Sequence, residues 1–578
     1  MKRTLLLNLA IALLAALFFI PGLGVVRLFD WDEINFAESA REMLVTGDWF
    51  NVRINFEPFW EKPPLFIWAQ ALSMKAFGVN EFAARLPNAL MGIVTLLLLF
   101  NIGRKTEDER FGLIWAMMYG ISFLPFFYFK SGIIDPWFNV FIFLGIYFFS
   151  RYTDPAAERL RCRHAALGAL FIGLAILTKG PVALLVFCLT VSVWIIAHRF
   201  LFSFRWKDVA VWILVLAAVG GSWFLLLALS GHSDVISDFI AYQIRLFRTK
   251  DAGHGGFLLY HFVILLLGVA PASVFALSTF KPGNLKGDGH TRTIGLAGWM
   301  LCAFWVVLIL FTIVRTKIVH YSSFCYFPVS MLAAYAATRM LDGKLRLRGY
   351  QRGLLIGIAA AFAIVLLLLT TFDLYKEKLI PLVHDPFAVS CMQASADWKG
   401  FEPFVGLILL GATIAFCVAF RKSPKGRHFI TLAAGNLIFA LTAILCAVPQ
   451  VEKYSQASAI DFYIDRQGED CYVQPAYFKS YAQYFYTQRL PQNNCDDFEW
   501  LCKGETDKPC YFVVKDIPAD VQRLRDDAPE AELLYSRPGF LFFVRQNGQQ
   551  APQEDQDDEE QGEVPENGEK DVDLVRRD

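Results

Sequence analysis

The stretch FDWDEINFAESAREML at residues 29–44, with FWEKPPL at 59–65, sets the organisation of this chain. It directly follows an apolar segment, residues 4–26, that is long enough to cross a bilayer. Charge beside a membrane is costly to keep unless it is paired or used. We therefore expect a functional loop at a membrane surface. Its acidic side chains stand among aromatic ones: Asp30, Asp32, Glu33, Glu38, Glu42, Glu57 and Glu61.

The composition of the 578-residue chain is that of a polytopic membrane protein. It is 55% apolar and 15% aromatic, with a mean hydropathy of +0.41. Its net charge is zero, so total charge indicates no nucleic-acid partner. The eleven cysteines show no CxxC or CxxH spacing typical of zinc sites.

Hydropathy predicts thirteen transmembrane helices in the first 448 residues, the N-terminal one being too long for an ordinary signal peptide. Alternate connections between them are basic, for example Arg104 and Lys105, and by the positive-inside rule these connections and the N-terminus are cytoplasmic. The expected spans are 4–26, 86–103, 111–129, 136–150, 165–179, 181–197, 209–229, 257–280, 294–314, 318–338, 353–372, 403–420 and 428–448.

The run 165–197 is ambiguous, because only Thr-Lys-Gly-Pro at 178–181 interrupts it. Two short transmembrane helices, joined by a turn at Lys179 on the outer side of the membrane, keep both flanking basic loops in the cytoplasm. A single tilted helix would invert the topology of everything downstream.

The interiors of the predicted spans carry no Lys, Arg, Asp or Glu, whereas transporters usually need ionisable groups at mid-membrane. Ionisable groups collect on the outer face instead. In the outer loop 27–85, one helix should be capped by Asp30 or Asp32 and end at Gly47, and a second should run from Pro64 to Gly78. Both are expected to lie in the membrane interface.

Residues 449–548 have the composition of a soluble α/β domain, placed in the periplasm if the host is Gram-negative. Strands are expected at 471–474, at 508–515 and in a hairpin at 532–545, with helices at 477–488 and 519–525. The four cysteines here, Cys471, Cys495, Cys502 and Cys510, allow three disulfide connectivities in an oxidising space. Residues 549–578, with twelve acidic and three basic residues, form an acidic tail predicted to be disordered.

Several strings resemble the bacterial lipid A aminoarabinose transferases of the GT-C superfamily, which also holds the protein O-mannosyltransferases. They are Asp32-Glu33, Ala-Glu-Ser-Ala-Arg-Glu-Met at 37–43, Gly-Asp-Trp at 47–49, Glu-Lys-Pro-Pro-Leu at 61–65 and Phe-Gly-Val-Asn-Glu-Phe-Ala-Ala-Arg-Leu-Pro at 77–87. Asp135, Thr-Lys-Gly-Pro at 178–181, and Lys317 with His320 and Tyr321 also match. The family's usual Asp-Glu-Thr-Arg reads Asp-Glu-Ile-Asn here, at 32–35.

The resemblance implies a bacterial inner-membrane GT-C glycosyltransferase. It would move a sugar from a polyprenyl-phosphate carrier to lipid A or another envelope acceptor at the periplasmic face. The resemblance implies that the family's catalytic and substrate-contact positions correspond to Asp32, Glu61, Lys62, Asp135 and Tyr321. Of these, Asp32, Asp135 and Glu61 are expected to be catalytic. The positions expected to bind substrate are Glu33, Lys62, Lys179, Arg245, Arg248, Lys317, His320 and Tyr321.

The chemistry of these residue types agrees with that role. A leaving phosphate needs cations, and a hydroxyl acceptor needs a carboxylate base; we expect Asp32 to be that base. An acceptor phosphate would already be anionic, and Asp32 would then orient it or stabilise positive charge on the sugar. Inversion in a single displacement is expected, since no separate nucleophile stands out. No cofactor is required, although the carboxylates could bind a divalent cation.

Structural readings compete with these assignments. Asp135 could cap a helix beginning at Pro136, Lys179 could snorkel, and Tyr321 could be an ordinary interfacial tyrosine. Two other functions also remain open: a protein O-glycosyltransferase, with the same chemistry on Ser or Thr, and a lipid-linked sugar transporter, which the charge-free spans disfavour.

Overall fold

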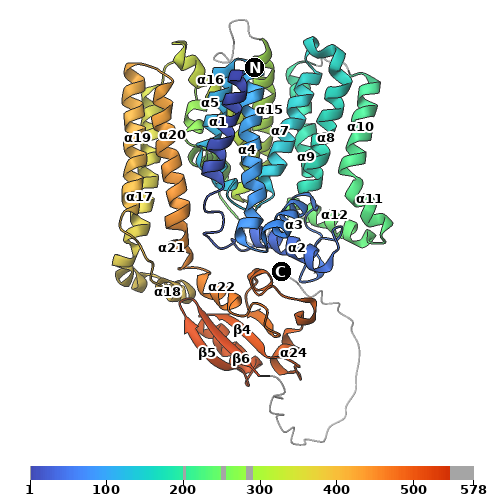
Figure 1. Ribbon diagram of the computed structural model, residues 1–578, viewed down its shortest axis with the longest axis vertical. Coiled ribbons are helices and arrows are strands. Elements are labelled where there is room, and N and C mark those ends of the chain that lie inside the picture. The colour runs from blue at the N-terminus through green and yellow to red at the C-terminus, as the bar shows by residue number, and fades with distance from the viewer. Residues whose placement is uncertain (1, 200–203, 249–254, 281–290, 547–578) are drawn as a thin grey trace, which may run out of the picture.

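The protein has two parts, a bundle of helices and a smaller unit with a four-stranded sheet packed against one end of the bundle (Figure 1). The computed structural model describes residues 2–199, 204–248, 255–280 and 291–546. The predicted acidic tail at 549–578 lies outside the described residues.

The bundle helices match the predicted apolar segments in position but not always in length. Seven helices are long and apolar enough to cross a membrane, and the bent pair α10–α11 makes an eighth, within the described residues. The bundle contains α1 (Lys2–Phe19), α4 (Glu81–Thr106), α5 (Glu109–Gly120), α6 (Phe123–Tyr128), α7 (Asp135–Tyr152), α8 (Arg161–Lys179), α9 (Val182–Ala197), α10 (Trp206–Gly220), α11 (Ser222–Leu229), α13 (Tyr260–Gly268), α14 (Ala272–Ala276), α15 (Thr291–Ile313), α16 (Tyr326–Leu341), α17 (Gly349–Leu379), α19 (Glu402–Lys422) and α20 (Arg427–Thr442).

Three of the thirteen expected spans are broken rather than continuous. The segment 111–129 breaks between α5 and α6, and 209–229 bends by 52° between α10 and α11. The segment 257–280 divides into α13 and α14 at Pro271, which has no N–H to continue a helix. Helix length by itself therefore supports fewer crossings than the hydropathy pattern predicts.

The ambiguous run 165–197 is two helices, which excludes the single tilted helix. The first, α8, ends at Gly180, whose φ of +99° favours glycine. A Cβ at this position would lie 2.8 Å from the ring of Phe239, so the turn also needs glycine for space. The Thr-Lys-Gly-Pro signal thus marks a sharp turn with Lys179 at the last position of α8.

Short elements cover the end of the bundle that faces the sheet unit (Figure 1). The helix α3 begins after Pro64 and ends at Gly78, as predicted. The helix α2 ends at Gly47, also as predicted, but its N-cap is Trp31, with no capping side chain, so the expected cap by Asp30 or Asp32 is wrong. These elements are α2 (Asp32–Thr46), β1 (Arg53–Ile54), β2 (Glu57–Pro58), α3 (Leu65–Phe77), α12 (Ser233–Arg248), the 3-10 helix η3 (Val319–Cys325) and α18 (Pro386–Met392).

The helix α2 is enclosed on all sides, which corrects the expectation that it lies in the membrane interface. Every residue from Glu33 to Met43 is buried. Its charges are paired internally: both carboxylate oxygens of Glu38 accept hydrogen bonds from Arg41, at 2.6 and 2.7 Å. The sheet unit contributes to this burial, since its helix α23 (Ala482–Tyr486) packs against α2.

The C-terminal unit is a mixed α/β structure with strand order β3-β4-β6-β5. β3 and β4 are parallel and the other neighbours antiparallel, with the predicted hairpin turning at Gly539. The predicted helix 477–488 is reduced to α23. The elements are α21 (Val448–Glu452), α22 (Ala457–Ile464), β3 (Tyr472–Ala476), α23 (Ala482–Tyr486), α24 (Phe498–Lys503), β4 (Cys510–Lys515), α25 (Pro518–Asp527), β5 (Glu532–Arg537) and β6 (Phe540–Arg545).

The cysteines of this unit do not pair. All eleven cysteines of the chain lie in described segments and are free thiols. Cys471, Cys502 and Cys510 are buried in its core. There they act as small apolar residues, and the expected disulfides are absent from the structure.

The C-terminal unit is bonded to the loop that carries Asp32. The Tyr486 hydroxyl accepts a hydrogen bond from the Leu28 N–H at 2.7 Å, and Arg489 Nη1 donates to Asn55 Oδ1 at 3.0 Å. Helical structure also runs from α20 through a π-helical turn into α21, across the predicted boundary at residue 448. The two parts therefore hold the loop between them.

Candidate active site

Five separate segments bring the predicted site residues to one end of the bundle. Asp32 opens α2, Glu61 and Lys62 precede α3, Asp135 opens α7, Lys179 ends α8, and His320 and Tyr321 lie in η3. In Figure 1 this is the end covered by α2, α3 and α12. Residues nearly 300 positions apart in sequence therefore share one region.

A buried ion pair joins α7 to α8. Lys179 Nζ lies 2.6 Å from Asp135 Oδ1, and the two side chains are 14% and 3% exposed. The ammonium also lies 5.7 Å from the ring centre of Phe138 and 5.8 Å from that of Tyr321. Asp135 is thus fixed by a cation and does not merely cap the helix, while Lys179 does not reach to solvent.

His320 lies among the predicted acids and bases. Its Nε2 is 3.7 Å from Asp32 Oδ2, longer than an ordinary hydrogen bond. Burial lowers the pKa of His320 below its usual range; Asp135 and Asp32 oppose this, whereas Lys179 and Lys62 add to it. A neutral imidazole at neutral pH follows. Asp32 itself is 44% exposed, so it is the carboxylate of this cluster most open to a substrate.

Glu61 and Lys62 form a second pair, completed by a residue the sequence did not single out. Lys62 Nζ is 3.6 Å from Glu61 Oε2, and the Tyr242 hydroxyl donates to the same oxygen at 3.1 Å. Tyr242 comes from α12, and its ring lies 5.3 Å from the Lys62 ammonium and 5.3 Å from the Arg245 guanidinium carbon. The only sequence signal for it was its place one turn before Arg245.

Arg245 and Arg248 were predicted together as donor-binding residues on α12. Arg245 is exposed, and its guanidinium lies over Tyr242. The side chain of Arg248 lies outside the described residues.

Glu33 binds other groups of the protein, whereas the sequence predicted that it contacts the substrate. Its carboxylate is 1% exposed and pairs with Arg85, Oε1 with Nε at 2.7 Å and Oε2 with Nη2 at 2.8 Å. It also accepts the N–H groups of Phe29, at 2.8 Å, and Gly132. This geometry holds the loop before α2 in place.

Lys317 is likewise turned toward the protein. Its ammonium donates to the carbonyls of Phe311, Thr312 and Val314 at 2.8, 2.7 and 2.6 Å. These are carbonyls at the C-terminal end of α15 that have no helical partner, and a cation there is favourable. Lys317 caps a helix in this structure and does not face the other site residues.

No group of three or more His, Cys, Asp and Glu side chains that could hold a metal ion occurs in the described parts of the chain. The cluster offers carboxylates, lysines and a neutral imidazole close together. Such a set can bind a phosphate and orient an anionic or hydroxyl acceptor.

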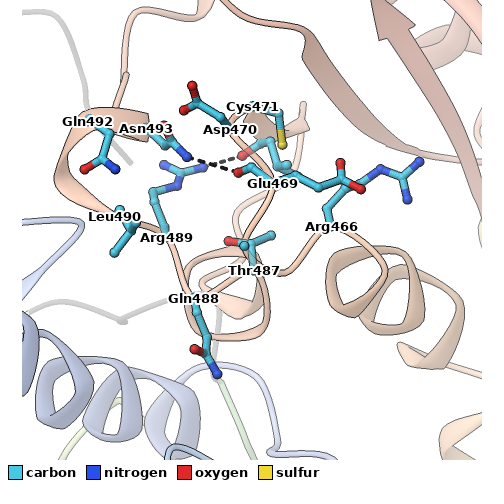
Figure 2. Close-up of a pocket in the computed structure, with 12 residues that line it drawn as sticks. Arg466, Glu469, Asp470, Cys471, Thr487, Gln488, Arg489, Leu490, Gln492 and Asn493 are labelled. Carbon is cyan, nitrogen blue, oxygen red and sulfur yellow. Dashed lines mark hydrogen bonds between the residues drawn. The ribbon is translucent and has the colours of Figure 1, made fainter.

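A separate pocket of about 180 Å³ lies in the C-terminal unit, between β3 and the segment 487–493 (Figure 2). Its wall carries charges of both signs, including Arg466, Glu469 and Arg489, and the Asn493 amide donates to the Glu469 carbonyl at 3.2 Å. None of the predicted site residues lines it.

Comparison with known proteins agrees with this arrangement. Residues 61–223 match the family model described as dolichyl-phosphate-mannose-protein mannosyltransferase. The undecaprenyl phosphate-alpha-4-amino-4-deoxy-L-arabinose arabinosyl transferase of Edwardsiella ictaluri is 29% identical over 62% of this chain and 64% of its own length. The transferase with the same name from Enterobacter sp. (strain 638) is 24% identical over 93% of this chain and 98% of its own.

The fold also has a solved counterpart. The crystal structure of ArnT from Cupriavidus metallidurans bound to undecaprenyl phosphate superposes with a TM-score of 0.74 at 19% identity, covering 95% of this chain and 99% of that one. The chain is thus similar to the aminoarabinose transferases along nearly its whole length, and it shares the fold of ArnT. It is a multi-pass membrane glycosyltransferase, and its cluster of acids and lysines is the candidate active site.

Proposed function

We propose that this glycosyltransferase moves aminoarabinose, or a closely related sugar, from undecaprenyl phosphate to lipid A. The observation that carries the proposal is the arrangement at one end of the bundle: Lys179 pairs with Asp135, Lys62 pairs with Glu61, and His320 lies 3.7 Å from Asp32. The named substrates of the relatives support the choice of donor and acceptor. In the reaction, the bond between the anomeric carbon and the carrier phosphate breaks, an acceptor oxygen bonds to that carbon, and the carrier phosphate leaves.

The lysines are the proposed phosphate-binding groups. Lys62 and Lys179 are each paired with one carboxylate and largely buried, so they are held in place before substrate arrives. A phosphate can share or take over either ammonium without any large movement. Charge on the leaving phosphate would then be neutralised where water is scarce, which makes each contact stronger.

Asp32 is the proposed group that faces the acceptor. Its exposure and its position beside a neutral His320 distinguish it from the enclosed Asp135. With a hydroxyl acceptor it would act as base. With a lipid A phosphate it would orient the acceptor or stabilise positive charge on the sugar. Direct attack by the acceptor inverts the anomeric configuration.

Four further residues are assigned by their contacts. Glu61 would be positioned by Tyr242 and Lys62, and Tyr321 would support Lys179 through its ring. Glu33 and Lys317 would act as positioning residues, because groups of the protein already bind the carboxylate of Glu33 and the ammonium of Lys317.

The membrane arrangement is part of the proposal. Thirteen crossings, short and broken ones included, place the N-terminus in the cytoplasm, and the site and the sheet domain in the periplasm. The basic connections support this orientation. The proposed domains are residues 1–448, with loop 27–85 at the site, 449–548, and the tail 549–578.

The test uses the full chain in vesicles with radiolabelled undecaprenyl-phosphate aminoarabinose and lipid A. Wild type should label lipid A, and Asp32→Asn should bind the donor but not transfer. The matched control is Asp342→Asn, which should transfer normally; Asp342 is a 33% exposed carboxylate paired with Arg110 at 2.8 Å. Unlabelled lipid A with wild type would refute the acceptor assignment.

The match of residues 61–223 to the mannosyltransferase family favours one alternative acceptor, a protein Ser or Thr. A peptide acceptor in the same vesicles tests it. Label on the peptide and none on lipid A would favour this second function.

A further inference from the structure

Trp31, the residue before Asp32, is exposed and held in an unusual conformation. Its φ is 77° and its ψ is −110°, and 44% of the residue is accessible. A bulky side chain with positive φ is rare and persists only where its surroundings enforce it. Trp31 is therefore a large aromatic surface presented next to the proposed acceptor-facing carboxylate.

The C-terminal domain supplies the other half of this surface. The Tyr481 ring meets the Trp31 ring edge-on at 5.9 Å, and Lys479 Nζ lies 5.3 Å from the Trp31 ring centre and 5.4 Å from that of Tyr481. Asp30 ties the two segments together, since its Oδ1 accepts the N–H of Trp31 at 2.9 Å and that of Tyr481 at 3.4 Å. We call Trp31, Tyr481 and Lys479 the junction cluster.

The lysine of the junction cluster has no carboxylate partner. Within the described residues no Asp or Glu oxygen lies within 4.0 Å of Lys479, whereas Lys62 and Lys179 are each paired with an acid. Lys479 is also exposed. Two rings thus flank an exposed ammonium that forms no ion pair, and such an ammonium can bind an anion.

Two aromatic rings beside a fixed ammonium suit a phosphorylated sugar. The carbon-bound face of a sugar ring can pack on an aromatic surface, and an ammonium binds phosphate as a point charge. Fixed aromatic side chains also lose little conformational freedom on binding. An aromatic belt residue would anchor the protein in lipid, but it would need no unpaired lysine from another domain.

We propose that the junction cluster is the acceptor subsite, and that it binds the phosphorylated sugar headgroup of a lipid through Lys479 on the phosphate and Trp31 and Tyr481 on the sugar. This rests on the proposed function, whose acceptor it places between the loop and the C-terminal domain. The acceptor then lies beside Asp32, the residue that follows Trp31 in the chain.

The test compares the binding of lipid A and of lipid A stripped of its phosphates to the full chain in detergent. Wild type should bind the phosphorylated lipid about tenfold more tightly. Lys479→Ala should abolish that preference and leave the dephosphorylated lipid unaffected. Trp31→Ala should weaken both lipids about tenfold, and Trp31→Phe should restore most of the affinity.

Lys515→Ala is the matched control. Lys515 also lies over two rings, those of Phe387 and Phe478, at 4.9 and 5.1 Å, but it is on β4. It should leave both affinities unchanged. Thermal unfolding of each variant at the wild-type temperature shows that the fold is retained.

Equal affinity of wild type for the two lipids would overturn the proposal. So would a phosphate preference that survives Lys479→Ala, or one that Lys515→Ala removes. Donor binding, measured separately with undecaprenyl phosphate, should be unchanged in every variant. If wild type binds lipid A with these preferences but transfers no sugar to it, the proposed function fails; the junction cluster then binds the phosphorylated lipid but is not an acceptor subsite.

Discussion

Replacing Glu33 by Gln should destabilise the protein strongly and displace the loop that carries Asp32. The carboxylate accepts four hydrogen bonds, two from Arg85 and two from the N–H groups of Phe29 and Gly132. An amide would turn an NH₂ group toward at least one of these donors and leave the buried guanidinium without its counter-charge. Breaking a buried ion pair from one side costs about 3–5 kcal/mol. We expect that loss, together with a fall of at least about tenfold in transfer rate.

Thermal unfolding in one detergent, with the transfer assay in parallel, measures both effects. The double variant Glu33→Leu with Arg85→Met removes both charges and should be more stable than Glu33→Gln, because no unpaired ion remains. Asp342→Asn breaks a half-exposed pair and should cost no more than about 1 kcal/mol. A Glu33→Gln variant as stable as wild type that no longer binds donor would refute this reasoning and return Glu33 to direct substrate contact.

Three further predictions concern the site and α2. Asp32→Asn should abolish transfer while unfolding at the wild-type temperature, since Asp32 is half-exposed; loss of donor binding in this variant would contradict its acceptor-side role. Lys179→Ala should weaken donor binding at least about tenfold and destabilise the protein, because it leaves Asp135 buried and unpaired. Lys179→Arg should recover most of the stability. Equal donor affinity in wild type and both variants would rule out phosphate binding by Lys179. Burial, with Glu38 nearby, raises the pKa of Glu42 from 4.5 to about 9, so the stability that its protonated form contributes is complete below pH 4.5 and is lost as pH rises through 9. Glu42→Gln should flatten this decline in unfolding stability, measured across that pH range. An unchanged slope would show that another group titrates.

Local signals located much of the site because they depend only on neighbouring residues. Gly47, Pro64, Gly78 and Gly180 end or begin helices where the sequence placed those boundaries, because each restricts or frees its own backbone. The motif strings indicated the acids and lysines that the fold brings together. The strings did not predict that Asp135 and Lys179, which are 44 positions apart, form a pair at 2.6 Å.

The sequence did not predict the role of a residue whose contact partner lies far away along the chain. The sequence could not show that Glu33 faces Arg85 or that Lys317 caps α15, because a charged residue in a loop looks the same whether it meets substrate or protein. It likewise indicated that the helix ending at Gly47 lies in the membrane interface, whereas α2 is enclosed by other segments of the protein. Tyr242 and Lys479 carried no motif at all.

The sequence by itself determined the class of protein, the face on which its charges gather and the residues suited to phosphate chemistry, because hydropathy and local motifs act over one helix or one turn. The tertiary structure decided which of those charges are exposed and which are paired. It also decided that Tyr481 and Lys479 of the C-terminal unit lie beside Trp31, next to Asp32. Burial and pairing depend on contacts between segments hundreds of residues apart, and only the folded chain sets those contacts.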